Sequence, residues 1–353
     1  MIVHEWASGD GDTEAEGRRF GAAWAPQLRA ARDAYLDLFA RSGVPEDVAR
    51  SVARQSGAAT LEHAPEVAAE FRGVAAGSGL AVADILLLTA RTEILARMTP
   101  SMECSTIVHV PSSGDAPRTL QTWDWHETLS NETVVRRWRS ASGTRVAAFC
   151  EFGQPAKIGV NDRGLGVHFN ILHHRSDGSQ PGVPVHVLSR MILDDAVSID
   201  EAVSIARSVP LAASSVLTVV GRDGAAAIEV APAGVAVLPV ARGETFAHTN
   251  HFLDPALAAG EYSPYETTSI PRYDCLVDNA DLAGIAASRE RALAFGSVPG
   301  PGISVRPRAD QPAHVRWETK LTVALDVADP SLEFAAAAPR DAASAPWRRF
   351  AAV

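Results

Sequence analysis

The pattern of this chain changes abruptly at Cys104. Before that residue, apolar side chains recur at helical spacing, as in APQLRAARDAYLDLFARSG and in AVADILLLTARTEILARM, which stops just before Pro100. From Cys104 onward come short β-branched segments and turn residues, beginning with CSTIVHV, PSSGDAPR and TLQTWDW. The sequence therefore predicts that residues 1–103 are helical and nearly free of strands, and that a β-hairpin begins at Cys104.

Strand signals continue through the rest of the chain. The segments VAAFCEF, GVNDRGLGVHFNIL and SVLTVVGRDGAAAIEVAPAGVAVLPV contain turn residues, and TKLTVALDVADPSLEFAAAAP has the pattern of a last hairpin. Helical patterns interrupt the strands at VPVHVLSRMILDD, SIDEAVSIARS and LAGIAASRERALAF. This mixture predicts an α+β layered domain in which helices cover the sheets. We expect residues 1–103 and 104–353 to form one integrated domain.

Composition excludes several classes of protein. The chain has 353 residues, 46% of them hydrophobic, which is typical of a globular protein. Its formal net charge is −10, which argues against nucleic acid as a partner. Apolar runs such as ILLL are far shorter than the roughly 20 residues that span a bilayer, and the N-terminus lacks the apolar stretch of a secretory signal. We expect a cytoplasmic protein that binds neither nucleic acid nor a membrane.

Three cysteines are too few and too scattered for a disulfide framework, and none belongs to a CxxC pair. The eleven histidines form no HExxH motif, so we expect no metal and no cofactor. We assign Cys150 and Cys275 to packing. Cys104 differs because it opens a strand directly after a helical segment, where an N-terminal nucleophile would stand. Cleavage before it would free a thiol together with an α-amine of pKa roughly 7.7 to 8.0, which can deprotonate the thiol without a histidine.

Four segments carry a resemblance to a known family. In order and approximate spacing, ECSTIVHV, QTWDWHETL, GVNDRGLGVHFNIL and FAHTNHFLDP resemble the acyl-coenzyme A:6-aminopenicillanate (isopenicillin N) acyltransferase family of self-processing cysteine hydrolases. The resemblance extends from about Arg91 to the last hairpin, and QTWDW and HTNHF are its most specific pieces. It implies a four-layer αββα fold of the N-terminal nucleophile (Ntn) hydrolase type, preceded by a helical leader. It also implies autoproteolysis between Glu103 and Cys104.

The resemblance assigns roles to individual residues. Cys104 is expected to be the nucleophile of both self-cleavage and catalysis. Asp124 in QTWDW is expected to orient and tune the freed amine. Asn250 in HTNHF matches the amide that donates to the oxyanion, a contact worth roughly 10²-fold to 10³-fold in rate. Asn170 in VHFNIL is expected to be a second polar contact of the site, although a cap or turn amide is an equal interpretation.

The related amidases also use an arginine. Arg306 in GISVRP is the candidate by position, and Arg272 in SIPRY is its rival. Gln121 stands where the bile-salt amidases carry an arginine, which argues against a bile-salt substrate.

The implied activity is amide hydrolysis or acyl transfer through a thioester on Cys104. The substrate would be a small-molecule amide such as an N-acyl amine, a peptide-like amide or a β-lactam, with a coenzyme A thioester left open as acyl donor. The two fragments would form a heterodimer. Two alternatives stay open, the first of which is supported by Glu103, because the fungal acyltransferase has glycine at that position. One is a binding or accessory protein that never matures, and the other is an uncut hydrolase that pairs Cys104 with His126.

Overall fold

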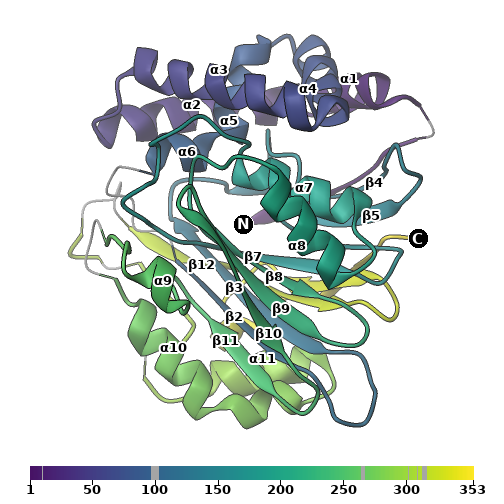
Figure 1. Ribbon diagram of the computed structural model, residues 1–353, viewed down its shortest axis with the longest axis vertical. Coiled ribbons are helices and arrows are strands. Elements are labelled where there is room, and N and C mark those ends of the chain that lie inside the picture. The colour runs from purple at the N-terminus through teal and green to yellow at the C-terminus, as the bar shows by residue number, and fades with distance from the viewer. Residues whose placement is uncertain (10, 97–102, 264–266, 301, 308, 312–315) are drawn as a thin grey trace.

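Two β-sheets lie face to face at the centre of the computed structural model, with helices outside them (Figure 1). The structure describes residues 1–9, 11–96, 103–263, 267–300, 302–307, 309–311 and 316–353. Sheet A has eight strands in the order β1-β4-β5-β6-β7-β8-β9-β10, and sheet B has six in the order β11-β2-β3-β12-β13-β14. Every neighbouring pair is antiparallel except β1 and β4, which are parallel.

The strands of sheet A are β1 (Ile2–Ala7), β4 (Glu132–Arg139), β5 (Arg145–Glu151), β6 (Ile158–Asn161), β7 (Gly166–Ile171), β8 (Ser215–Val220), β9 (Ala225–Ala231) and β10 (Gly234–Val240). Those of sheet B are β2 (Cys104–His109), β3 (Arg118–His126), β11 (Thr245–His248), β12 (Trp317–Asp326), β13 (Ser331–Ala335) and β14 (Arg348–Ala351). The predicted hairpin that begins at Cys104 is β2 paired with β3.

Helices cover the outer face of each sheet. Sheet A is covered by α7 (Val185–Asp195) and α8 (Ile199–Ser208). Sheet B is covered by α10 (Ser269–Asp278), the 3-10 helix η1 (Ala280–Gly284) and α11 (Ser288–Gly296). The short helices α9 (Pro255–Ala258) and η3 (Pro339–Asp341) lie in connections. The predicted α+β class and its four αββα layers are thereby confirmed.

The leader, residues 1–96 as the structure describes them, forms a helical cap across one end of the sheets (Figure 1). Its helices are α1 (Thr13–Ala23), α2 (Ala25–Arg41), α3 (Glu46–His63), α4 (Pro65–Ser78), α5 (Val82–Thr89) and α6 (Arg91–Leu95). The prediction of an almost strand-free leader is wrong for β1, which adds to the edge of sheet A beside β4. Six residues with little alternation in their pattern form a strand here because a distant strand supplies the hydrogen-bonding partner.

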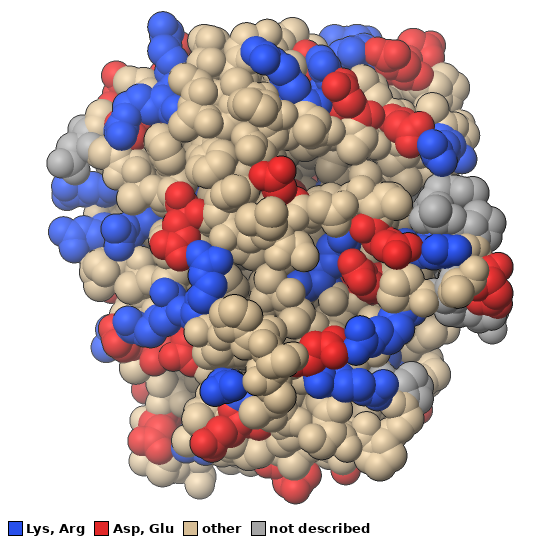
Figure 2. All heavy atoms as spheres, turned by 180° about the vertical axis from the view of Figure 1, so that it is seen from behind, with Lys and Arg blue, Asp and Glu red and all other residues tan. Residues whose placement is uncertain are grey.

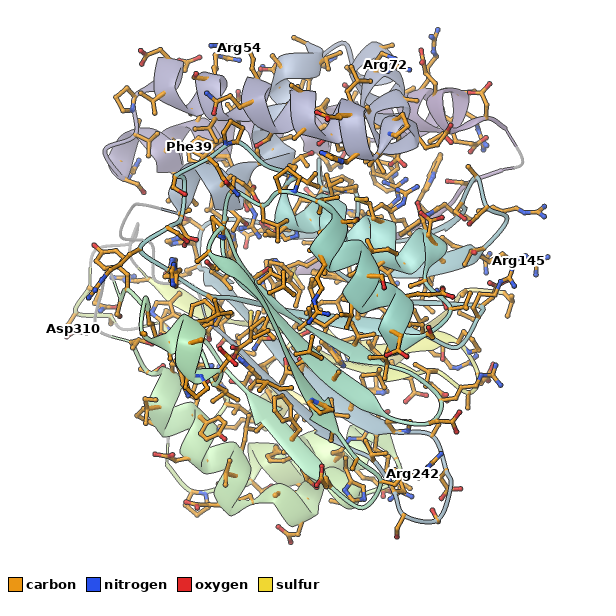
Figure 3. All side chains as sticks on the ribbon, in the orientation of Figure 1. Phe39, Arg54, Arg72, Arg145, Arg242 and Asp310 are labelled. Atoms are coloured by element: carbon orange, nitrogen blue, oxygen red, sulfur yellow. The ribbon has the colours of Figure 1, made fainter. Side chains whose placement is uncertain are left out.

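The main hydrophobic core lies between the sheets and extends into the leader. It joins Phe39 of α2 and Leu87 of α5 to Trp123, Phe149 and other residues of both sheets. Figure 3 shows Phe39 in the layer between leader and sheets, while Arg54 and Arg72 project from the outer side of the cap. The leader and the sheets therefore share one core.

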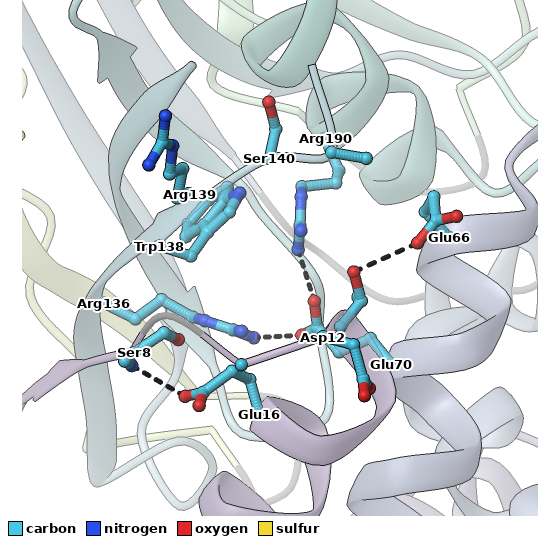
Figure 4. A pocket seen from close by; sticks show the side chains of 14 residues that line it. Ser8, Asp12, Glu16, Glu66, Glu70, Arg136, Trp138, Arg139, Ser140 and Arg190 are labelled. Atoms are coloured by element: carbon cyan, nitrogen blue, oxygen red, sulfur yellow. Dashed lines mark hydrogen bonds and ion pairs between the residues drawn. The ribbon is translucent and has the colours of Figure 1, made fainter. Parts of the chain in front are cut away.

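A buried charge cluster also ties the leader to sheet A. Glu70 of α4 accepts from Arg136 of β4 at 2.6 Å and from Arg190 of α7 at 2.7 Å, beside a cavity of about 300 Å³ (Figure 4). Burial opposes ionisation of Glu70, but the two arginines prevail and lower its pKa to about 2. Because the charges in this cluster pair with one another, we regard it as a structural contact.

The surface mixes charges of both signs. On the face seen in Figure 2, acidic and basic side chains are interspersed among uncharged ones. Within the described ranges, the helices include none with the length and apolarity that a membrane span requires.

Candidate active site

Cys104 is the first residue of β2, and the pairing of β2 with β3 fixes the direction of its side chain. Residues opposite each other in an antiparallel pair share a face, so Cys104 points to the same side as its partner Trp123. That side faces sheet A, because Thr106, two residues on, donates to Asn170 of β7 at 2.7 Å. Ser105 points the other way, toward α10, where it accepts from Arg272 at 2.7 Å. The sulfur of Cys104 therefore lies between the two sheets.

The peptide bond between Glu103 and Cys104 is buried and is held by hydrogen bonds on both sides. The carbonyl oxygen of Glu103 accepts from the backbone N–H of Asp124 at 3.1 Å. The N–H of Cys104 donates to Oδ1 of Asn250 at 2.8 Å, and the Cys104 carbonyl oxygen accepts from Nη1 of Arg272 at 2.6 Å. Both residues that form the bond are buried. These three partners lie on β3, after β11 and on α10, and the fold brings them to this single bond.

Asn250 lies two residues after the end of β11, and its hydrogen bonds define the orientation of its side-chain amide. Its Oδ1 accepts from Cys104 N–H and also from Nη2 of Arg272 at 2.8 Å, so the oxygen faces both donors. Its Nδ2 donates to the carbonyl of Ile171 at 2.8 Å. An amide nitrogen carries two hydrogens, which leaves one for an oxygen on a substrate.

Asn170 supports this arrangement from β7. Its Oδ1 accepts from Thr106 and from Gln121, and its Nδ2 donates to the carbonyls of His248 and Thr249. These bonds hold the end of β11 in place, directly before Asn250. The structure thus places Asn170 behind the site, where it fixes the backbone that carries another candidate residue.

Asp124 lies next to Trp123 on β3, so its side chain points to the opposite face, toward α10. It is fully buried, and it lies opposite Thr319 in the pairing of β3 with β12. Burial raises the pKa of Asp124 to about 7, although the positive charge of Arg272 opposes the rise. A buried carboxylate is suited to receive the ammonium group that cleavage before Cys104 would create.

The structure brings Arg272, and not Arg306, to this site. Arg272 lies on α10 and is almost completely buried, with hydrogen bonds to Cys104, Asn250 and Glu103. Arg306 is 57% exposed and pairs with Asp341 at 2.6 Å. The preference for Arg306 rested on its position near the last hairpin. Burial of one arginine depends instead on how α10 packs against sheet B, which local sequence does not report.

Lys157 is a site residue that the sequence analysis missed. Its Nζ lies 4.1 Å from the ring centre of Trp123, which shares a face with Cys104, and 3.0 Å from Glu151. Burial lowers the pKa of Lys157 to about 8, against the opposing charge of Glu151. Burial also raises the pKa of the Cys104 thiol to about 12, and Lys157 is the charge that most opposes this rise. The sequence does contain a signal for Lys157, because the chain has only two lysines and uses arginine at its other basic positions.

The alternative pairing of Cys104 with His126 meets a geometric obstacle. His126 lies three residues beyond Trp123 on β3, and an odd spacing along a strand reverses the face. The two side chains therefore lie on opposite faces of sheet B. As for metals, no cluster of three or more His, Cys, Asp or Glu that could bind an ion occurs in the described part of the chain.

Known proteins resemble this chain in sequence and in structure. A family model described as acyl-coenzyme A:6-aminopenicillanic acid acyl-transferase matches residues 112–276. That range begins after Cys104, contains Asp124, Asn250 and Arg272, and ends before Arg306. A curated relative from Emericella nidulans, the 40 kDa form of acyl-coenzyme A:6-aminopenicillanic-acid-acyltransferase, is 27% identical over 203 residues. The match covers 57% of this chain and 56% of the relative, so it spans little more than half the length of that protein.

Solved structures with partial likeness include penicillin V acylase from Agrobacterium tumefaciens, at a TM-score of 0.41 and 13% identity over 66% of this chain and 83% of that one. A mutant of conjugated bile acid hydrolase from Clostridium perfringens has a TM-score of 0.41 and 12% identity over 65% of this chain and 88% of that one. The family match and the curated relative confirm the resemblance that the sequence motifs indicate: over residues 112–276 this chain is similar to the acyl-coenzyme A:6-aminopenicillanic acid acyl-transferase family.

Proposed function

We propose that the protein is an Ntn-type cysteine amidohydrolase or acyltransferase that cuts its own chain between Glu103 and Cys104. The observation that carries the proposal is the fixed environment of that peptide bond. Its carbonyl oxygen accepts from Asp124 N–H, and its nitrogen donates to Asn250. A buried bond with a donor on its oxygen and a thiol on the next residue is arranged for attack from within the chain.

Self-cleavage begins when Sγ of Cys104 attacks the carbonyl carbon of Glu103. The backbone N–H of Asp124 stabilises the negative charge that develops on the Glu103 oxygen. The C–N bond then breaks, the nitrogen takes the thiol proton, and Glu103 is left as a thioester on Cys104. Water adds to the thioester carbon and releases the Glu103 carboxyl group and the thiol. The products are residues 1–103 and a chain that begins with a free amine on Cys104.

The same residues then serve turnover. The α-amine of Cys104 takes the thiol proton. Asn250, whose Oδ1 already accepts from the Cys104 nitrogen, orients the amine, and the nearby charge of Asp124 stabilises its protonated form. Lys157 favours the thiolate by its charge. The sulfur attacks the carbonyl carbon of an amide substrate, the amine leaves with the proton, and water or an acceptor amine removes the acyl group.

Several features of the enzyme remain predictions. The donor is a small-molecule amide, with a coenzyme A thioester as an alternative, and the choice between hydrolysis and transfer depends on the acceptor. The chemistry uses no metal and no cofactor. The two fragments stay together as a heterodimer because the leader shares its core with the sheets. The expected cytoplasmic location and the expected lack of nucleic-acid and membrane partners rest on composition.

Cleavage can be tested by intact mass and denaturing electrophoresis of three proteins. Wild type should yield fragments 1–103 and 104–353, and Cys104→Ala should remain one full-length chain. Cys275→Ala is the matched control, because Cys275 lies half-buried on α10 and should not affect the cut. A wild-type chain that stays whole after long incubation would refute self-processing and favour the accessory protein that never matures.

A further inference from the structure

The side chain of Glu103 occupies a built carboxylate site. It is fully buried, and each of its oxygens accepts two hydrogen bonds. Oε1 accepts from the backbone N–H of Thr268 at 3.0 Å and from the hydroxyl of Thr267 at 2.6 Å. Oε2 accepts from Nη2 of Arg272 at 2.9 Å and from the hydroxyl of Thr268. The site lies at the N-terminal end of α10, where the helix dipole also favours an anion.

The groups that bind the Glu103 carboxylate remain in the protein after self-cleavage. After self-cleavage Glu103 is the last residue of the leader and no longer bonded to Cys104. If its side chain departs, Arg272 retains its guanidinium in a buried position without that carboxylate. The loss of a hydrogen-bonded carboxylate from a buried cation is costly, so the vacated site attracts another carboxylate. The donors that would bind it belong to residues 267–272 and are not altered by the cut.

The chemistry of the cut connects this site to the substrate. In self-cleavage the acyl group that passes to Sγ of Cys104 is Glu103 itself. In turnover, the carbonyl carbon of a substrate forms a bond to the same sulfur. The group attached to that carbon then lies beside the same walls that Glu103 contacts in the uncut chain.

We propose that Arg272, Thr267 and Thr268 form the acyl-specificity site of the mature enzyme and select acyl groups that end in a carboxylate. In Glu103, three carbons separate the reacting carbonyl from the carboxylate. The matching donors are glutaryl amides and N-acyl-α-glutamyl amides. This inference rests on the proposed function, because it requires that Cys104 accept the acyl group.

The reaction with a glutaryl amide balances without a further reactant. Sγ of Cys104 bonds to the amide carbonyl carbon, the C–N bond breaks, and the amine leaves with the thiol proton. Water then adds to the thioester and releases glutarate and the free thiol. The distal carboxylate stays ionised throughout, paired with Arg272.

Two p-nitroanilide substrates can distinguish the effect of a terminal charge from the effect of acyl-chain length, because their acyl groups have the same number of carbons. The self-cleaved protein is assayed with glutaryl-p-nitroanilide and valeryl-p-nitroanilide, and kcat/KM is measured for each. Charge-assisted hydrogen bonds to a buried carboxylate lead us to expect a preference of about ten- to a hundredfold for the glutaryl donor. Equal values, or a preference for the valeryl donor, would overturn the inference.

Two variants test whether the preference for the glutaryl donor arises at this site. Thr268→Val removes a hydroxyl from the site and should reduce the ratio of the two kcat/KM values severalfold. Thr268 makes no side-chain cap to α10, so this change leaves the helix cap intact. Thr218→Val is the matched control, because Thr218 is buried in β8 and its hydroxyl has no partner among the described residues. A ratio that responds equally to both variants would also overturn the inference.

Binding gives a readout that does not need turnover. Calorimetry on the self-cleaved protein should show glutarate binding at least about tenfold more tightly than valerate, and equal affinities would contradict the inference. The two proposals fail in different ways. A chain that never cuts overturns both, whereas a cut chain that forms thioesters with both donors at equal rates overturns only the acyl-specificity site.

Discussion

Asp124 lies beside the bond that we expect the protein to cut, and its surroundings change when that bond breaks. In the uncut chain it is buried, and burial raises the pKa of its carboxyl to about 7. In a cut chain, the ammonium of Cys104 would supply a positive partner and favour the ionised form. The buried Asp124 carboxylate should therefore destabilise the uncut chain near neutral pH, and the ammonium that the proposed cut would create should relieve this cost.

In the uncut Cys104→Ala protein, Asp124→Asn should raise the free energy of unfolding above pH 7 by roughly 1 to 4 kcal/mol, with little effect below pH 4. The folded carboxyl titrates near 7 and the unfolded one near 3.9, so between these values only the folded state holds the proton. The free energy of unfolding of the Cys104→Ala protein thus falls as pH rises through that window. The Asp124→Asn variant escapes this loss because an amide does not titrate. Urea unfolding at several pH values measures the difference, and an effect independent of pH would contradict it.

Lys157 should act on the thiolate through its charge. Lys157→Met should lower kcat/KM at pH 7 by about tenfold or more and move the alkaline rise of the pH profile to higher pH, because the Cys104 thiolate loses a nearby cation. Lys157→Arg keeps the charge and is the control, with a smaller shift expected. An unchanged pH profile in Lys157→Met would assign Lys157 to packing alone.

At the scale of elements, local pattern predicted the hairpin of β2 and β3, because its strands are rich in β-branched residues and flank a clear turn. It failed for β1, whose partner β4 is remote in sequence. It also could not rank Arg272 above Arg306, since α10 buries Arg272 only by packing against sheet B. Sequence motifs thus predicted Cys104 and Asn250 as candidate site residues. The contacts that Arg272 makes with them depend on long-range packing and could not be predicted from local sequence.

The leader contains a close helix pair that depends on glycine. A Cβ added at Gly73 of α4 would overlap the carbonyl oxygen of Glu14 in α1. Gly73→Ala must therefore separate the two helices and should lower the free energy of unfolding by about 1 to 3 kcal/mol. Gly284→Ala is the control, because its Cβ would meet open space. Urea denaturation of both variants decides the point, and equal stabilities would show that the helices adjust without cost.

At the scale of the whole molecule, the cut would separate two chains that share one core. Phe39 and Leu87 of the leader pack in the same cluster as Trp123 and Phe149. The charge cluster of Glu70, Arg136 and Arg190 adds a second contact across the same boundary. The fragments should therefore stay associated under native conditions and separate only on denaturation.

Glu70→Gln should weaken this association. It leaves Arg136 buried without its anion and Arg190 with Asp194 alone, which costs roughly 3 to 5 kcal/mol. The pKa of Glu70 is lowered from 4.5 to about 2, so its contribution is complete above pH 4.5 and is lost as pH falls toward 2. Glu70→Gln should therefore show a smaller fall in the free energy of unfolding between pH 4.5 and pH 2 than the parent protein. Unfolding followed from pH 6 to pH 2 tests this, and identical acid profiles would be the contrary result.

The most direct test of the account follows cleavage and activity together in one sample. Freshly expressed wild type is incubated, and intact mass, N-terminal sequence and amide turnover are recorded over time. If self-cleavage creates the active site, turnover rises in proportion to the amount of the chain that begins Cys104, Ser105, Thr106. Full turnover by a chain that is still joined at Glu103 would contradict it.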